Sequence, residues 1–158
     1  MKPIVAALIT AVTLAALTAM AQQKPQQPAP AAAQPAEEPY QPGLSEIMAL
    51  QQMRHLKLWF AGRDGNWPLA DYEIGELGDG FNDVSKLLGG DLAEQHVGAP
   101  MKALAQIVAD KNLTAFPAAF DKLSAGCNTC HATLDHGFIV IQRPTLLPYS
   151  DQAFALQR

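Results

Sequence analysis

The sequence has little positive charge and very few cysteines. Only 11 of the 158 residues are Lys or Arg, and they form no basic cluster or stripe. A nucleic-acid-binding surface needs such a cluster to neutralise phosphates, so we expect no nucleic acid as a partner. The only two cysteines are Cys127 and Cys130. A structural zinc site would need a further Cys or His pair at a defined spacing, and His96 and His136 are not so placed.

A long uninterrupted hydrophobic run is also lacking. Residues 4–19 are almost uncharged and lead to a small-x-small sequence at residues 19–21. This run is shorter than the ~20 apolar residues of a membrane span and contains threonines, which makes a membrane anchor the weaker interpretation. The pattern instead predicts a secretory signal peptide over residues 1–21, a periplasmic location, and no membrane insertion once the signal is cleaved.

Proline, alanine and glutamine dominate residues 22–43, which show no periodic apolar pattern. Such a segment cannot bury enough surface to offset its ordering entropy. We therefore expect a disordered tether that joins the export signal to the folded domain.

Helical periodicity predicts one all-α domain over residues 44–136. The expected helices run from Leu44 to about Ala61, from close to Pro68 to Gly89, from near Pro100 to Asp110, and from near Thr114 onward, with a connecting segment at 91–99. Short links between four helices favour an antiparallel up-down-up-down bundle. The first helix is apolar nearly all round, which is compatible with a homodimer or with burial under another segment.

Two polar residues interrupt the apolar stripe of the first predicted helix. Gln51 and His55 share a face with Met48 and Leu58 at 100° per residue. A histidine there is most simply a core residue bonded to a neighbour, although a cofactor pocket would also place it inside.

Both cysteines belong to the sequence Cys127-Asn128-Thr129-Cys130-His131. This spacing is typical of covalent c-type haem attachment, because residues three apart on a helix present both thiols to one porphyrin edge while the next imidazole reaches the iron. A disulfide, a zinc site and coincidence are the alternatives. A redox-active Cys-x-x-Cys normally opens a helix in a βαβ unit, whereas this one lies deep in a predicted helix.

The chain resembles the cytochrome c-prime family around this motif. The resemblance is seen in residues 103–107, 112–116 and 123–131, which are similar to the last two helices of those periplasmic four-helix bundles. It implies one covalent haem c, with Cys127 and Cys130 as thioether sites and His131 as the proximal iron ligand.

The second axial position would decide what such a haem does, since an open iron binds gases and a ligated iron mainly exchanges electrons. At 1.5 Å per residue, Met48 lies roughly 6 Å into the first helix and His131 roughly 6 Å from the end of the last, whereas His55 lies roughly 16 Å deep. Met48 is therefore the expected sixth ligand and His55 the less favoured alternative. The resemblance agrees, because low-spin relatives use a methionine early in the first helix. A core role for Met48 is the competing interpretation.

The sequence departs from that family after His131. Relatives usually continue the helix, whereas this chain has Gly137 and then four large apolar residues at 138–141. Pro144 and Pro148 prevent a helix there, so we expect an extended tail over 137–158. Four such side chains in a row are expected to leave water by packing on the domain or over the haem edge.

These patterns predict a non-enzymatic periplasmic electron carrier that exchanges electrons with a redox partner of unknown identity. The alternative is a five-coordinate haem protein that binds or senses nitric oxide or carbon monoxide. A weaker alternative is a haem-free thiol-disulfide protein that uses Cys127 and Cys130.

Overall fold

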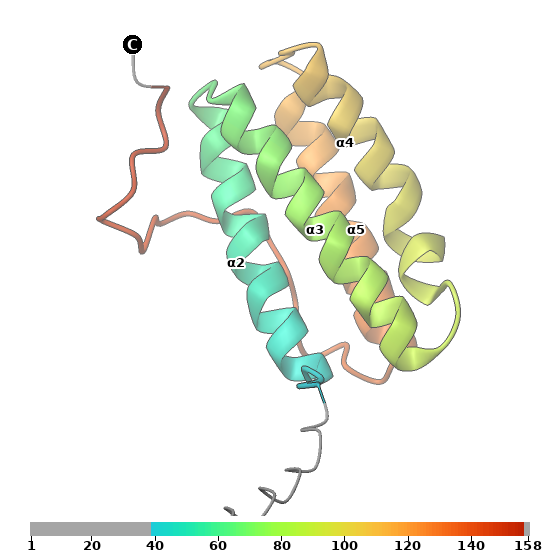
Figure 1. Ribbon diagram of the computed structural model, residues 1–158. Coiled ribbons are helices and arrows are strands. Elements are labelled where there is room, and N and C mark those ends of the chain that lie inside the picture. The colour runs from blue at the N-terminus through green and yellow to red at the C-terminus, as the bar shows by residue number, and fades with distance from the viewer. Residues whose placement is uncertain (1–38, 157–158) are drawn as a thin grey trace, which may run out of the picture. The chain divides into compact units, whose positions relative to one another are not determined.

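The computed structural model describes residues 39–156 and contains no strand within that range. The predicted signal peptide and all of the predicted tether except residues 39–43 lie outside the described residues. The described part is all-α, as the sequence predicted (Figure 1). Its helices are α2 (Leu44–Arg63), α3 (Trp67–Leu88), the short π-helix η1 (Glu94–Gly98), α4 (Ala99–Ala109) and α5 (Phe116–Thr133).

The four α-helices alternate in direction, as expected for an up-down-up-down bundle. The ribbon runs up α2, down α3, up α4 and down α5 (Figure 1). The first turn of α2, the end of α3 and the end of α5 therefore meet at one end of the bundle, and η1 joins α3 to α4 at that same end.

Polar side chains and glycines define the helix ends. The Glu46 carboxylate accepts hydrogen bonds from the Gly43 N–H and the Tyr40 hydroxyl at the start of α2. At the start of α3, the Asn66 side chain accepts from the Leu69 N–H. Such caps satisfy backbone donors that have no partner inside the helix. Gly89, with φ +73°, ends α3 in a backbone conformation that suits glycine.

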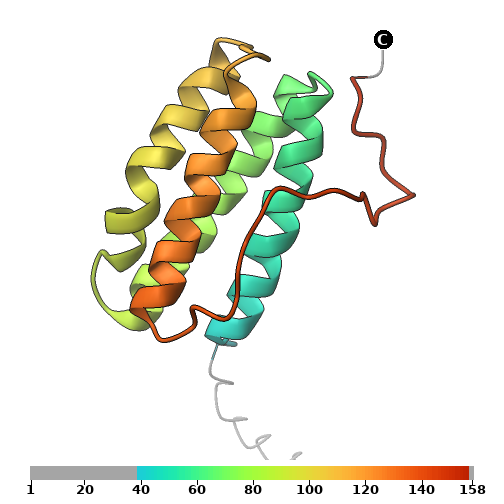
Figure 2. The ribbon, with the colours of Figure 1, turned by 180° about the vertical axis from the view of Figure 1, so that it is seen from behind.

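A left-handed residue ends α5 shortly after the cysteine motif. Asp135 has φ +60°, the Asp135 N–H donates to the Ala132 carbonyl, and the His136 N–H donates to the His131 carbonyl over 2.7 Å. This pair of bonds is the Schellman arrangement, here with aspartate where glycine is usual. The chain consequently reverses and runs back along α5 (Figure 2).

Aromatic packing closes the other end of the bundle. Phe116 and Phe120 are fully buried, and their ring centroids lie 6.0 Å apart. Trp59 of α2 lies 6.0 Å from Phe116 and 5.1 Å from Phe120. Trp67, at the start of α3, meets Phe116 edge-on at 6.2 Å. These contacts join α2, α3 and α5 in one aromatic cluster.

The helix boundaries were predicted closely, with two errors. The expected connection at 91–99 is largely helical and includes η1, so His96 lies in a helix and is partly buried. A π turn just before Pro100 keeps the chain helical although proline donates no N–H. The apolar spacing of three and four residues that begins at Ala70 and continues through Ile74, Leu77, Phe81 and Val84 also predicts a packed Leu88, but Leu88 is 40 % exposed because α3 ends there.

None of the helices in the described range is both long and apolar enough to cross a membrane.

Gly62 allows α2 to approach the aromatic cluster. A Cβ atom at Gly62 would lie 2.0 Å from Cζ of the buried Phe116 ring. We therefore expect Gly62→Ala to lower the free energy of unfolding by about 1–3 kcal/mol, the usual result of overpacking a core. Urea denaturation followed by circular dichroism measures this change.

Gly75→Ala is the matched control, because nothing lies within 4 Å of a Cβ atom at that helical position. It should raise stability by about 0.5–1 kcal/mol. Equal effects of the two substitutions would contradict the proposed steric role of Gly62.

Candidate functional site

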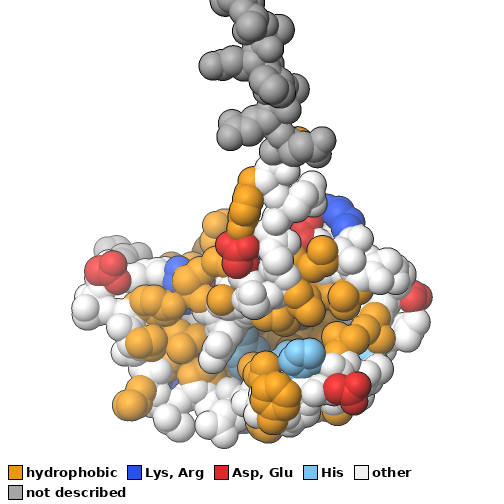
Figure 3. All heavy atoms as spheres, turned by 90° about the horizontal axis from the view of Figure 1, so that it is seen from below, with side chains coloured by type: hydrophobic (Ala, Val, Ile, Leu, Met, Phe, Trp, Pro, Cys, Tyr) orange, Lys and Arg blue, Asp and Glu red, His pale blue; other side chains and the backbone are white. Residues whose placement is uncertain are grey.

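A cavity of about 650 Å³ occupies the open end of the bundle. This volume is within the range of roughly 300–1,000 Å³ that is common for small-molecule and cofactor sites. The space-filling view onto this end shows a hollow bordered by hydrophobic and histidine side chains (Figure 3). Its lining comes from α2, α3, the η1 region, α5 and the segment after α5: Leu44, Ser45, Met48, Ala49, Gln51, Gln52, His55, Leu77, Phe81, Val84, Ala93, Val97, Leu123, Cys127, Cys130, His131, Leu134, His136, Ile139 and Ile141.

Cys127 and Cys130 both face this cavity and are free thiols. Burial raises the pKa of Cys127 to about 12, and the neighbouring Cys130 contributes to the same shift. Burial also raises the pKa of Cys130. Both side chains are therefore protonated at neutral pH, unlike the thiolates of reactive dithiol sites, whose pKa values are lowered.

His131 lines the same cavity with one ring nitrogen already bonded. Its Nδ1 lies 2.8 Å from the backbone carbonyl oxygen of Ile139. A carbonyl can only accept, so Nδ1 must donate a proton. In the neutral ring Nε2 is then the atom with the free electron pair, which is the arrangement that metal-binding histidines commonly adopt.

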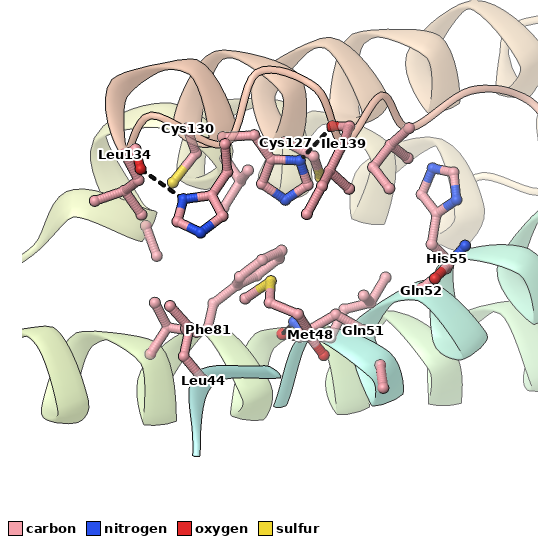
Figure 4. Close-up of a pocket in the computed structure, with 18 of the residues that line it drawn as sticks. Leu44, Met48, Gln51, Gln52, His55, Phe81, Cys127, Cys130, Leu134 and Ile139 are labelled. Carbon is pink, nitrogen blue, oxygen red and sulfur yellow. Dashed lines mark hydrogen bonds between the residues drawn. The ribbon is translucent and has the colours of Figure 1, made fainter. Parts of the chain in front are cut away.

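Met48 lies on the wall of the cavity opposite Cys127 and Cys130. In the close-up, Met48 and Phe81 point from α2 and α3 toward the α5 wall, where Cys127 and Cys130 are found (Figure 4). Met48 is partly buried and packs against the hydrophobic core. The structure thus brings Met48, Cys127, Cys130 and His131 to one cavity.

His55 also borders the cavity, but it lies farther along α2 than Met48 (Figure 4). Its Nε2 is 2.8 Å from the Ser124 hydroxyl, which itself donates to the Phe120 carbonyl at 3.1 Å. Because the Ser124 proton is already used, Nε2 of His55 is the donor in the first bond. Burial lowers the pKa of His55 to about 4, and the ring packs 4.3 Å from Phe120.

Gln51 is the second polar residue in the apolar stripe of α2, and its hydrogen bonds explain why a polar side chain is buried there. Its amide nitrogen donates to the Leu77 carbonyl at 2.8 Å, and its amide oxygen accepts from Arg54 at 3.0 Å. Arg54 is in turn paired with Glu76 at 2.8 Å. Gln51 therefore links α2 to α3 beside the cavity.

The segment after α5 forms one side of the cavity and is named the strap here (residues 137–143). The Asn128 side-chain amide donates to the Ile141 carbonyl at 2.8 Å, and its oxygen accepts from the Ile141 N–H at 2.7 Å. Farther along, Arg143 forms an ion pair with Asp121 and lies 4.6 Å from the Trp59 ring. The strap is thus bonded to the last turns of α5 through Asn128 and to an earlier turn through Asp121.

The expectation that all four apolar side chains of the strap would leave water is wrong. Phe138 is 80 % exposed, Val140 67 % and Ile139 44 %. Ile139 and Ile141 line the cavity, whereas Phe138, in the turn that follows α5, and Val140 face solvent. Backbone hydrogen bonds, rather than burial of every side chain, attach this segment.

Three contributors to the site were missing from the sequence prediction. Ser124 bonds His55, Asn128 bonds the strap, and the Ile139 carbonyl bonds His131. Asn128 lies between the two cysteines, but nothing in its spacing predicts a partner thirteen residues away. The Ile139 acceptor is a backbone group, for which the side-chain pattern gives no signal.

No group of three or more His, Cys, Asp or Glu side chains in residues 39–156 is arranged to hold a metal ion. The zinc interpretation of the cysteine motif therefore has no further set of donors in this part of the chain.

The chain was compared with protein-family models, curated proteins and solved structures, and none of them matches it.

The buried His55 should make stability depend on pH. Its pKa is about 4 in the folded chain and near 6.5 when exposed, so the unfolded chain binds the proton first as pH falls. The stabilisation is complete above about pH 6.5 and is lost as pH falls toward 4, by about 2–3 kcal/mol at pH 4.5.

Urea unfolding of the wild type and His55→Gln at pH 7 and pH 4.5 isolates this contribution, because carboxylates titrate in both proteins. The pH-dependent loss should be smaller in His55→Gln by that amount. Identical losses would show that His55 is not buried in its neutral form.

Proposed function

We propose that this chain is a periplasmic monohaem c-type cytochrome that carries electrons. Cys127 and Cys130 would attach the haem as thioethers, His131 would be the proximal iron ligand, and Met48 the sixth ligand. The observation that supports this proposal best is the geometry of His131. Its Nδ1 is committed to the Ile139 carbonyl, so Nε2 is available on the cavity side where both thiols also lie.

The residues around the cavity fit a haem. Its walls are mainly hydrophobic, with Phe81, Val84 and Leu123 among the lining residues. The two thiols and the imidazole come from α5, and the thioether of Met48 comes from the opposite wall. Haem supplies one-electron chemistry when it is bound, and histidine with methionine as axial ligands raises its potential.

The chain's own side chains have separate tasks in this proposal. Cys127 and Cys130 would fix the position of the porphyrin, because each sulfur would be bonded to it as a thioether. The Ile139 carbonyl orients the His131 ring. The apolar side chains of Phe81 and Leu123 line the cavity and would keep water away from a bound haem.

Geometry favours Met48 over His55 as the sixth ligand. His55 donates from Nε2 to Ser124 and packs on Phe120, so it would have to break both contacts to turn toward the site. Met48 has no such polar partner, since a thioether is only a weak acceptor. A haem protein with Met48 as an apolar wall and an open sixth position, binding nitric oxide or carbon monoxide, is the alternative from another functional class.

The raised thiol pKa values argue against the dithiol alternative. The proposal also rests on two features of the sequence: the resemblance to the cytochrome c-prime family and the signal peptide predicted over residues 1–21. The partner would be a periplasmic redox protein, and the surface next to the cavity would be its docking site.

Covalent attachment is tested by expression in a bacterium that performs periplasmic haem attachment. The wild type should be coloured and heavier than the processed polypeptide by one haem, as measured by mass spectrometry of the denatured protein. The double variant Cys127→Ala, Cys130→Ala should have the mass of the polypeptide alone. A wild-type mass without haem would overturn the proposal, and titration of two free thiols would then support the dithiol alternative.

The sixth ligand is tested by optical spectra of the oxidised, reduced and carbon monoxide-treated protein. The wild type should be low-spin and insensitive to carbon monoxide, whereas Met48→Ala should become high-spin and bind it, because alanine offers no ligand atom. Met53→Ala is the matched control, since Met53 is on α2 but not in the cavity lining. His55→Gln should stay low-spin.

A wild type that is already high-spin and binds carbon monoxide would favour the gas-binding alternative. Loss of the low-spin spectrum in His55→Gln alone would assign the ligand to His55.

A further inference from the structure

The strap is fixed most tightly at a point close to His131. Asn128 and His131 lie three residues apart, on the same side of α5, and they bond to Ile141 and Ile139, which lie two residues apart in the strap. The hydrogen bonds of Asn128 and of His131 are therefore adjacent both on α5 and on the strap. A displacement of the strap at Ile141 would also displace the Ile139 carbonyl.

We propose that Asn128 is a positioning residue that holds the Ile139 carbonyl against Nδ1 of His131. Through this contact it fixes which ring nitrogen of His131 is presented to the cavity. The inference deepens the proposed function and rests on it, because His131 is assigned there as the iron ligand.

The chemistry of an asparagine side chain suits this task. Its amide has an NH₂ donor group and a carbonyl acceptor side by side. Here the carbonyl accepts from the Ile141 N–H at 2.7 Å, and the NH₂ group donates to the Ile141 C=O at 2.8 Å. An aspartate lacks the donor, and a serine has one oxygen for both roles. These two bonds are part-buried, which strengthens them relative to bonds in water.

The attachments of the strap that follow Ile141 in the chain are weaker or lie farther from His131. Phe138 and Val140 are mostly exposed, so their packing holds the segment weakly. Arg143 is attached to Asp121, but this ion pair is exposed, and Asp121 lies about 15 Å from His131 along α5 at 1.5 Å per residue. Exposed pairs of this kind contribute little. On its amino-terminal side Ile139 is held by its own N–H, which donates to the His136 carbonyl at 2.9 Å. On its carboxyl-terminal side the nearest anchor to α5 is Asn128, through Ile141.

Loss of this anchor has a specific consequence for the imidazole. Without a fixed acceptor, Nδ1 of His131 would bond to water, and the ring would no longer be held in one orientation. A carbonyl that accepts from Nδ1 raises the basicity of Nε2, which favours the oxidised state of a bound iron. Releasing the strap should therefore raise the reduction potential.

The experiment compares full-length wild type with Asn128→Ala and Asn128→Gln, and uses Thr129→Ala as the matched control. Thr129 is the adjacent residue of the motif, and its hydroxyl bonds only to the Ala125 carbonyl of its own helix. Asn128→Gln keeps the polarity and the helix but moves the amide by one methylene, so it provides a folded variant if the alanine variant is unstable.

Three quantities are measured: hydrogen exchange of the Ile141 amide, the ring-nitrogen NMR shifts of His131, and the reduction potential of the haem-loaded protein. Both Asn128 variants should show at least tenfold faster exchange at Ile141, ring shifts that indicate a changed tautomer or averaging, and a higher potential. Thr129→Ala should match the wild type in all three.

The inference would be overturned if the Asn128 variants kept the His131 ring shifts and the reduction potential of the wild type. Faster exchange of the Ile141 amide alone would show only that Asn128 anchors the strap. The outcome is separable from that of the proposed function. If no haem is attached, the proposed function fails, while the exchange rate at Ile141 and the His131 ring shifts still decide whether Asn128 positions the imidazole.

Discussion

The aromatic cluster at one end of the bundle is the contact on which the remaining arrangement depends. The ring of Trp59 on α2 packs against those of Phe116 and Phe120 on α5. Gly62 has no side chain, which leaves space for the Phe116 ring beside α2. Because the helices are joined firmly there, they need not be packed as tightly at the other end. The cavity between α2, α3 and α5 lies at the opposite end of the bundle from these aromatic contacts.

Polar groups near the cavity are bonded in a way that leaves its centre apolar. Gln51 turns toward α3, and His55 turns toward Ser124 on α5. None of the buried side-chain nitrogen or oxygen atoms in the described residues lacks a partner. A buried polar group without a partner would be destabilising by about 1–3 kcal/mol, so these bonds allow histidine and glutamine to line a mainly hydrophobic space.

Much of the fold could be predicted from the sequence because helix periodicity and capping are local properties. The apolar spacing from Ala70 to Leu88 predicts the buried side of α3. Four of its six residues are buried, Phe81 is partly buried, and Leu88 is exposed at the helix end. The prediction failed at 92–98, where Gly89-Gly90 and Pro100 suggested a connection. Buried Ala93 and Val97, four residues apart, were the helical signal that this interpretation overlooked.

The site was predictable only as far as its side chains follow a helical period. Cys127, Cys130, His131 and Met48 could be brought together by depth along two antiparallel helices, and all four line the cavity. The bonds from His131 and Asn128 to the strap could not be foreseen, since they depend on the path of the backbone after Asp135. That path is set by a left-handed aspartate, a conformation for which glycine is the usual indicator.

The strap's place in the chain also has a consequence for the order of assembly. Synthesis proceeds from the amino terminus, so the residues of all four helices are made before residues 137–143 follow. The side of the cavity that the strap covers therefore stays accessible longest. A ligand could enter the cavity at this stage, and the hydrogen bonds of the strap to Asn128 and His131 would then close this side behind it.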